Sequence, residues 1–65
     1  MENWRELLLD AERALMSGRP REALQYCDRA SFRGGEARHR ASLMRGRILL
    51  EIGDALGALT AFESI

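Results

Sequence analysis

The chain of 65 residues lacks several features that stabilise or localise small proteins. Cys27 is the only cysteine, so no disulfide can form within the chain, and a reducing compartment is expected. No apolar stretch approaches the roughly 18 residues that a membrane-crossing helix needs. The start, MENWRELLLD, lacks the basic and long apolar regions of a signal peptide. We therefore expect a soluble, cytoplasmic chain whose residues 1–65 form one domain.

Lysine is absent as well, and ten arginines balance ten acidic residues. A basic complement made only of arginine is typical of codon usage in bacterial genomes of high GC content. The zero net charge gives no support for general binding to nucleic acid or membrane. A chain of this size buries only about 60% of the surface that its unfolded form exposes, so we expect marginal stability without a partner.

The apolar residues follow a helical period, and no segment alternates with the period of two that a half-buried strand shows. A first helix is expected up to the break at Gly18, and a second begins near Pro20, whose missing N–H costs nothing there. Gly34 and Gly35 form the next break, and a third helix is expected over roughly 36–52. Asp54 is a good N-cap for a fourth helix.

The third of these helices is apolar on more than one side. Its main stripe consists of Ala37, Ala41, Met44, Ile48 and Ile52. Leu43, Leu49 and Leu50 widen this stripe, so we expect the helix to be buried against more than one neighbour.

The chain also repeats itself, because segment 17–30, SGRPREALQYCDRA, is similar to segment 52–65, IGDALGALTAFESI, at an offset of 35 positions. A repeat of this length that joins two helical hairpins is typical of an α-solenoid, in which each unit buries its apolar face against the next. The predicted fold class is therefore all-α, with two antiparallel helix-turn-helix repeats, about 3–33 and about 36–65, stacked as a short solenoid. Two unrelated helical hairpins are the alternative.

The repeated positions resemble the tetratricopeptide repeat (TPR) family, whose unit is 34 residues of paired helices. The small and aromatic positions of that family are matched by Ala11 and Gly46, by Ala23 and Ala58, and by Cys27 and Phe62. Asp10 and Arg45 depart from the pattern, because the family usually has Leu there. The resemblance implies a scaffold for protein–protein interaction, with the first helix of each pair lining a concave groove.

The resemblance also implies which residues line this groove. They are Arg5, Leu8, Glu12, Leu15 and Met16 in the first repeat, and Arg40, Leu43, Arg47, Leu50 and Glu51 in the second. Such a surface has an apolar floor with charged sides, so we expect it to accept an acidic or amphipathic peptide, with Arg40 and Arg47 pairing with carboxylates. The alternative is that these arginines form a solvated face whose charge Glu12 and Glu51 offset.

Nothing in the sequence indicates catalysis, a metal or a cofactor. Cys27 would need His39, the only histidine, as its base, and its place on an apolar helical face favours a buried structural role. One histidine and one cysteine do not make a zinc site, which needs four ligands. We therefore predict that the chain is not an enzyme and that it uses no cofactor.

The last segment, ALTAFESI, is apolar where the end of a solenoid usually carries polar residues. Leu59, Phe62 and Ile65 are predicted to form an interface, either between copies in a homo-oligomer or within a longer repeat array. Two other function classes are left open. One is a nucleic-acid-associated helical domain that uses Arg33, Arg38, Arg40, Arg45 and Arg47, and the other is a regulatory domain of a larger enzyme or transcription factor.

Overall fold

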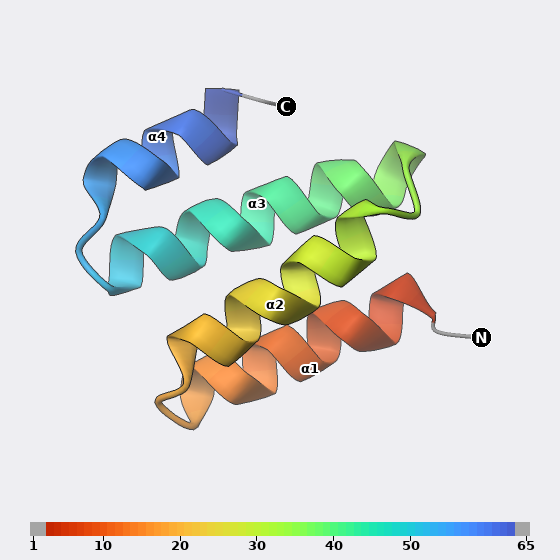
Figure 1. Cartoon of the computed structure of the whole chain (residues 1–65), viewed down its shortest axis with the longest axis horizontal. Coiled ribbons are helices and arrows are strands. Elements are labelled where there is room, and N and C mark those ends of the chain that lie inside the picture. Colours follow the sequence, from red (N-terminus) through yellow and green to blue (C-terminus); the bar gives the residue numbers. More distant parts are fainter. Residues whose placement is uncertain (1–2, 64–65) are drawn as a thin grey trace.

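The computed structural model describes residues 3–63, which form helices and turns with no strand in that range (Figure 1). The four helices are α1 (Trp4–Met16), α2 (Pro20–Ser31), α3 (Gly35–Glu51) and α4 (Ala55–Glu63). The all-helical class and the number of helices predicted from the hydrophobic period are confirmed. The third helix lies one residue earlier than the expected range of 36–52.

The two hairpin turns are built in the same way. In each, three successive N–H groups donate to the last carbonyls of the preceding helix, and the middle donor is a glycine with positive φ, Gly18 (78°) or Gly53 (85°). The bond that closes each turn is 2.8 Å long and joins the N–H of Arg19 to the carbonyl of Ala14, or the N–H of Asp54 to the carbonyl of Leu49. The sequence offset of 35 is thus also an offset between equivalent hydrogen bonds.

Side chains at the helix starts satisfy N–H groups that a helix leaves unpaired. Asn3 Oδ1 accepts from the N–H of Arg5 at 2.9 Å and caps α1. Asp54 Oδ1 accepts from the N–H of Gly57 at 2.9 Å and caps α4, as the sequence predicts. Pro20 occupies the first position of α2, also as predicted, because a helix needs no N–H there.

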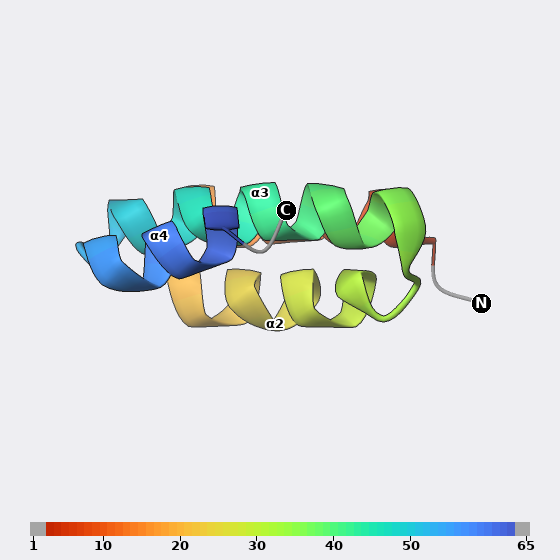
Figure 2. The ribbon, with the colours of Figure 1, turned by 90° about the horizontal axis from the view of Figure 1, so that it is seen from above.

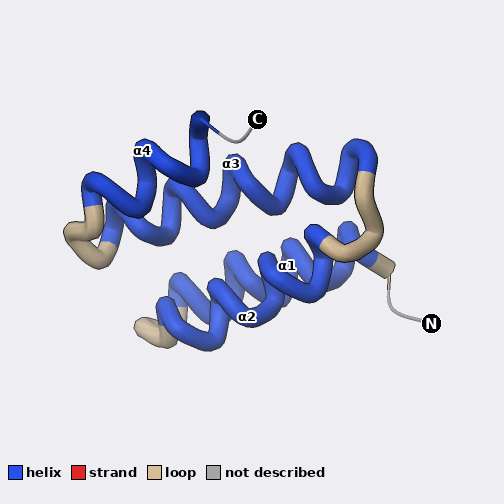
Figure 3. Tube along the Cα trace, turned by 45° about the horizontal axis from the view of Figure 1, so that its top comes forward, coloured by secondary structure: helices blue, strands red, loops and turns tan. Residues whose placement is uncertain are grey.

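The helices pack in chain order. α1 packs along α2, α2 along α3, and α3 along α4, while α1 also reaches α3 (Figure 1). Figure 2 shows α2 in a layer beneath α3, and the Cα envelope is a flat slab of 33 × 27 × 11 Å. Figure 3 shows the two helical hairpins one after the other along this slab. None of the helices in residues 3–63 is both long and apolar enough to span a bilayer.

The main core lies between α1, α2 and α3 and is made largely of small side chains. Its buried members are Leu7, Leu8, Ala11, Ala14, Ala23, Cys27, Ala30, Ala41 and Ile48. A smaller cluster of Leu49, Ala58 and Ala61 joins α3 to α4. Leu24 of α2 packs against both clusters, so it connects the two hairpins.

α3 is buried on two sides, as predicted, but its buried surface is narrower than its apolar stripe. Ile48 lies in the main core and Leu49 in the smaller cluster. Leu43, Leu50 and Ile52 are about half-exposed, because α2 and α4 cover only part of the circumference of α3. Leu43 therefore contributes to the surface described next.

Candidate functional site

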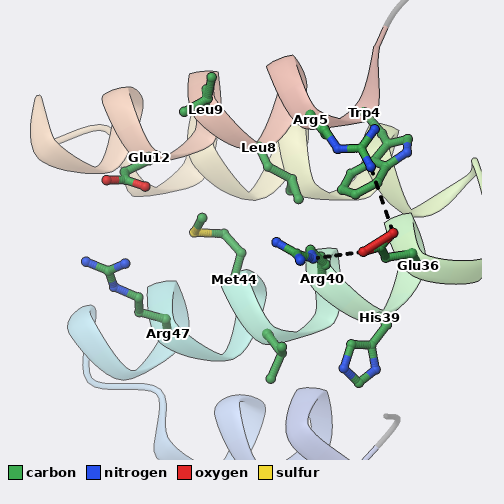
Figure 4. Close-up of a pocket in the computed structure, with 11 residues that line it drawn as sticks. Trp4, Arg5, Leu8, Leu9, Glu12, Glu36, His39, Arg40, Met44 and Arg47 are labelled. Atoms are coloured by element: carbon green, nitrogen blue, oxygen red, sulfur yellow. Dashed lines mark ion pairs between the residues drawn. The ribbon is translucent and has the colours of Figure 1, made fainter.

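A groove of about 730 Å³ lies between α1 and α3 (Figure 4). The residues from α1 are Trp4, Arg5, Leu8, Leu9 and Glu12, and those from α3 are Glu36, His39, Arg40, Leu43, Met44 and Arg47. On each helix these residues recur every three or four positions, so they share one helical face. The groove is thus formed by the first helix of each hairpin.

The floor of the groove is apolar and partly open to solvent. Leu8 belongs to the main core, and Met44 packs against that core while still lining the groove. Leu9 and Leu43 are 53% and 44% exposed, one from each side. Burial of apolar area from water drives most protein association, so these two leucines are the side chains from which a ligand can gain most.

Charges at one end of the groove are paired with each other. Glu36 lies between two guanidinium groups, 3.5 Å from Arg40 and 3.9 Å from Arg5 (Figure 4). The Arg5 guanidinium also stacks over the Trp4 ring, 4.4 Å from its centroid, in a cation–π contact. All three charged side chains are more than half exposed, so these pairs contribute little stability. They engage both guanidinium groups of this end with one carboxylate and leave it with a net charge of +1.

The other end carries charges that are not matched in this way. Glu12 extends from α1 and Arg47 from α3, and both lie at the end of the groove away from Trp4 (Figure 4). Within residues 3–63, neither side chain makes an ion pair or a side-chain hydrogen bond. Arg47 is exposed, so its guanidinium is available to a carboxylate of another molecule.

Six of the ten residues expected to line the groove do line it: Arg5, Leu8, Glu12, Arg40, Leu43 and Arg47. The other four lie in the last turns of α1 and α3, beyond the groove. Leu15 packs against the main core instead, whereas Met16, Leu50 and Glu51 are exposed. The groove is therefore shorter than expected and is displaced toward the start of both helices.

Five lining residues were not expected: Trp4, Leu9, Glu36, His39 and Met44. A helical-spacing signal was present for three of them, because Leu9 follows Arg5 by four positions and Glu36 and Met44 flank Arg40 by four. The resemblance to the TPR family implies only one row of residues along each helix. The helical face that lines the groove is wider and includes the neighbouring rows.

A second hollow, of about 240 Å³, lies on the other side of α3 and is lined by Cys27, Asp28 and Ser31 of α2 and by Arg38, Ala41, Ser42 and Arg45 of α3. Arg45 Nη1 is 2.5 Å from Asp28 Oδ1, an ion pair that joins the two hairpins and is shorter than the one between Arg5 and Glu36. Arg38 and Arg45 thus face α2, whereas Arg40 and Arg47 line the groove. The arginines of α3 do not form one basic surface.

Cys27 is 1% exposed and lies in the main core, in agreement with the structural role expected for it. Burial raises the pKa of its thiol from 9.0 to about 12, the charge of Asp28 raises it as well, and Arg45 acts in the opposite direction. The thiol is therefore protonated at neutral pH, and a thiolate nucleophile is not formed there.

Two of the three residues predicted to form an oligomer interface, Leu59 and Phe62, lie in α4. Leu59 is 55% exposed and Phe62 is partly exposed, and Ile65 lies outside the described residues. Leu56, one turn before Leu59, is exposed as well. The outer side of α4 is therefore apolar and is not covered by another helix of residues 3–63 (Figure 1).

A comparison of the chain with models of protein families, with curated proteins and with solved structures finds no match. Within residues 3–63, no group of three or more His, Cys, Asp or Glu side chains is arranged to hold a metal ion. The groove and the exposed side of α4 are the candidate functional surfaces of the described residues.

Proposed function

We propose that the chain is a protein-interaction module of TPR type, whose groove between α1 and α3 binds an amphipathic segment of a partner protein. One observation carries this proposal. The groove combines an open apolar floor with Arg47, an exposed cation that has no ion pair within residues 3–63. Apolar contact and a charge-assisted hydrogen bond are the two contributions by which grooves of helical proteins hold peptide segments.

The arrangement of charge specifies the orientation of the segment. Glu36 already pairs with Arg5 and Arg40, so Arg47 is the groove arginine without an ion pair in residues 3–63, and an acidic residue of the segment pairs with it at the far end. Its apolar residues contact Leu9 and Leu43, which line the groove from α1 and α3. A basic residue of the segment would pair with Glu12, which lies at the same end of the groove as Arg47. The preferred ligand is therefore amphipathic, with its acidic residue following its apolar residues toward Arg47.

The expected affinity is modest. Full burial of a leucine contributes about 1.5–3 kcal/mol, and Leu9 and Leu43 are each only about half-exposed to begin with. An exposed ion pair such as the one proposed for Arg47 adds at most about 1 kcal/mol. A single groove of this kind supports transient binding, which suits a scaffold that holds partners reversibly.

The alternative of a nucleic-acid-associated domain is less well supported. Arg40 lies in the groove beside Glu36, and Arg45 lies on the other side of α3 beside Asp28. Electrostatic binding to a phosphate backbone needs several cations on one face. The arginines of α3 are divided between two faces and partly neutralised on each.

Trp4 provides a direct test, because it is the only tryptophan and lines the groove. Two short synthetic peptides with leucines at helical spacing are titrated into the chain. One ends in two Glu residues, and the other has two Lys residues at the same positions. We expect the acidic peptide to change Trp4 fluorescence saturably and to bind at least about threefold more tightly than the Lys peptide.

The matched variants are Arg47→Glu, inside the groove, and Arg21→Glu, an equal change of charge at an exposed position of α2. Arg47→Glu should weaken the acidic peptide about tenfold, while Arg21→Glu leaves its affinity within about twofold. The proposal fails if the acidic peptide does not bind, or if the two variants lose affinity equally.

A further inference from the structure

The two hairpins are related by an offset of 35 positions, so α4 of the second corresponds to α2 of the first. The contacts that α2 makes with α3 therefore indicate which kind of helix can pack on the open side of α4. Within the chain, α3 covers α2. Leu24 of α2 is half-buried in that junction, where it packs against both clusters. One turn later, Asp28 pairs with Arg45 of α3 at 2.5 Å. An apolar contact followed by an ion pair therefore defines the junction.

The same two chemical types recur on α4. Leu59 lies 35 positions after Leu24, and Glu63 lies 35 positions after Asp28. Both are exposed, because within residues 3–63 no helix follows α4 as α3 follows α2. The open side of α4 thus repeats a leucine and a carboxylate that, on α2, are already matched by a neighbouring helix.

The N-terminal helix of another copy does not fit this surface. The face that α3 turns toward α2 includes Ala41, Arg45 and Ile48, and 35 positions earlier α1 has Glu6, Asp10 and Arg13. In a head-to-tail assembly, Asp10 would stand opposite Glu63, where the internal junction has Arg45 opposite Asp28. Two like charges at that place are repulsive, and charged residues would replace alanine and isoleucine against Leu59.

We propose that the open side of α4, defined by Leu59 and Glu63, binds an amphipathic helix of another protein, and that this helix resembles α3 rather than α1. Its contact stripe has a small apolar residue, then Arg or Lys four positions later to pair with Glu63, then a branched apolar residue three positions after that. This surface lies on α4, away from the groove, so its test does not depend on the proposed function of the groove.

The probe is a synthetic peptide with the sequence of residues 34–52, which contains α3 and its basic residue Arg45. It is added to the isotope-labelled chain, and amide chemical shifts locate the binding site. The shifts are expected to cluster on α4 around Leu59 and Glu63. Shifts confined to the groove, or an absence of binding, would overturn the proposal.

A charge exchange tests the chemistry of the contact. Glu63→Arg in the chain should weaken the peptide by about three- to tenfold, and an Arg45→Glu peptide should recover most of that loss on the Glu63→Arg chain. If the Glu63→Arg chain binds the Arg45→Glu peptide no more tightly than it binds the unchanged peptide, then Glu63 does not pair with the basic residue, and the proposed register is wrong.

A pair of matched leucine variants tests the apolar contact. Leu59→Glu should weaken the peptide more than tenfold, whereas Leu56→Glu should change its affinity less than twofold. Leu56 is 79% exposed and corresponds to Arg21, which stays exposed on α2 although α3 covers that helix. Circular dichroism of both variants establishes that each is folded. Equal losses in the two variants would contradict the register inferred from the repeat.

Sedimentation equilibrium of the chain alone tests whether the open side of α4 binds a second copy of the chain instead of a helix of another protein. We expect a monomer at concentrations where the peptide binds. A dimer that Leu59→Glu dissociates would overturn it, because the open side of α4 would then be an interface between copies.

Discussion

Gly46 of α3 and Phe62 of α4 fit together because the glycine has no side chain. A Cβ placed on Gly46 would lie well inside the van der Waals distance of the Phe62 ring. The residues 35 positions earlier are Ala11 and Cys27, and both are buried in the main core. In the second hairpin, a glycine on one helix thus makes room for a large ring on the other. In the first hairpin, the equivalent positions carry two small side chains.

This relationship predicts that Gly46→Ala destabilises the chain although alanine favours helices. The gain in helix propensity is about 1 kcal/mol, while displacement of the Phe62 ring costs about 1–3 kcal/mol. The expected net loss in the free energy of unfolding is about 1 kcal/mol, measured by urea denaturation. Phe62→Cys removes the clash and reproduces the Ala11 and Cys27 pair of the first hairpin.

The double variant Gly46→Ala, Phe62→Cys should therefore be at least about 1 kcal/mol more stable than the sum of the two single changes predicts. Additive effects would mean that the ring moves aside without cost. In that case the glycine is not required for the close approach of α3 and α4.

The repeated turns predict equal sensitivity at Gly18 and Gly53. Each has a positive φ and donates to the last turn of the preceding helix, so alanine at either position adopts a strained backbone. Each substitution should lower the free energy of unfolding by about 1 kcal/mol, with a difference between them below about 0.5 kcal/mol. Thermal unfolding followed by circular dichroism makes the comparison, with exposed Ser17→Ala as a control that leaves both glycines in place.

Burial of Cys27 predicts a loss of stability at high pH. The pKa of the thiol is about 12 in the folded chain and 9.0 when it is not perturbed. Between these values the unfolded chain loses its thiol proton while the folded chain keeps it, so the free energy of unfolding falls as pH rises from about 9 toward 12. The contribution of this group has a limiting slope of about 1.4 kcal/mol per pH unit.

The Cys27→Ala variant isolates this effect from the other groups that titrate in the same range, because it should lack the added slope. At pH 8 the thiol of the folded chain should also react with a disulfide reagent far more slowly than in denaturant. A native labelling rate equal to the denatured rate would contradict the burial of Cys27.

The helices were predictable because local signals agree with packing. Gly18, Pro20 and Asp54 mark three helix boundaries, and the structure has a turn or a helix start at each. The caps and glycine turns depend on residues a few positions apart, which the sequence shows directly. The Asn3 cap is not among the predicted helix starts, although asparagine is a favoured N-cap.

The groove was only partly predictable because its extent depends on how α1 and α3 approach each other. Arg5 and Arg40 were identified individually, but their shared contact with Glu36 joins two helices and has no signature in local spacing. The resemblance places Leu15 in the groove, yet its side chain packs against the main core. Distances between helices decide both outcomes, and a sequence pattern specifies faces rather than distances.

The most direct test of the proposed function is a methyl and amide NMR titration of the labelled chain with the acidic amphipathic peptide. If the groove binds the peptide, the shifts concentrate on Leu9, Leu43, Met44 and Arg47, with little change on α4. Shifts spread along the outer side of α4 instead, with the groove unperturbed, would contradict the claim that the groove between α1 and α3 is the peptide-binding site.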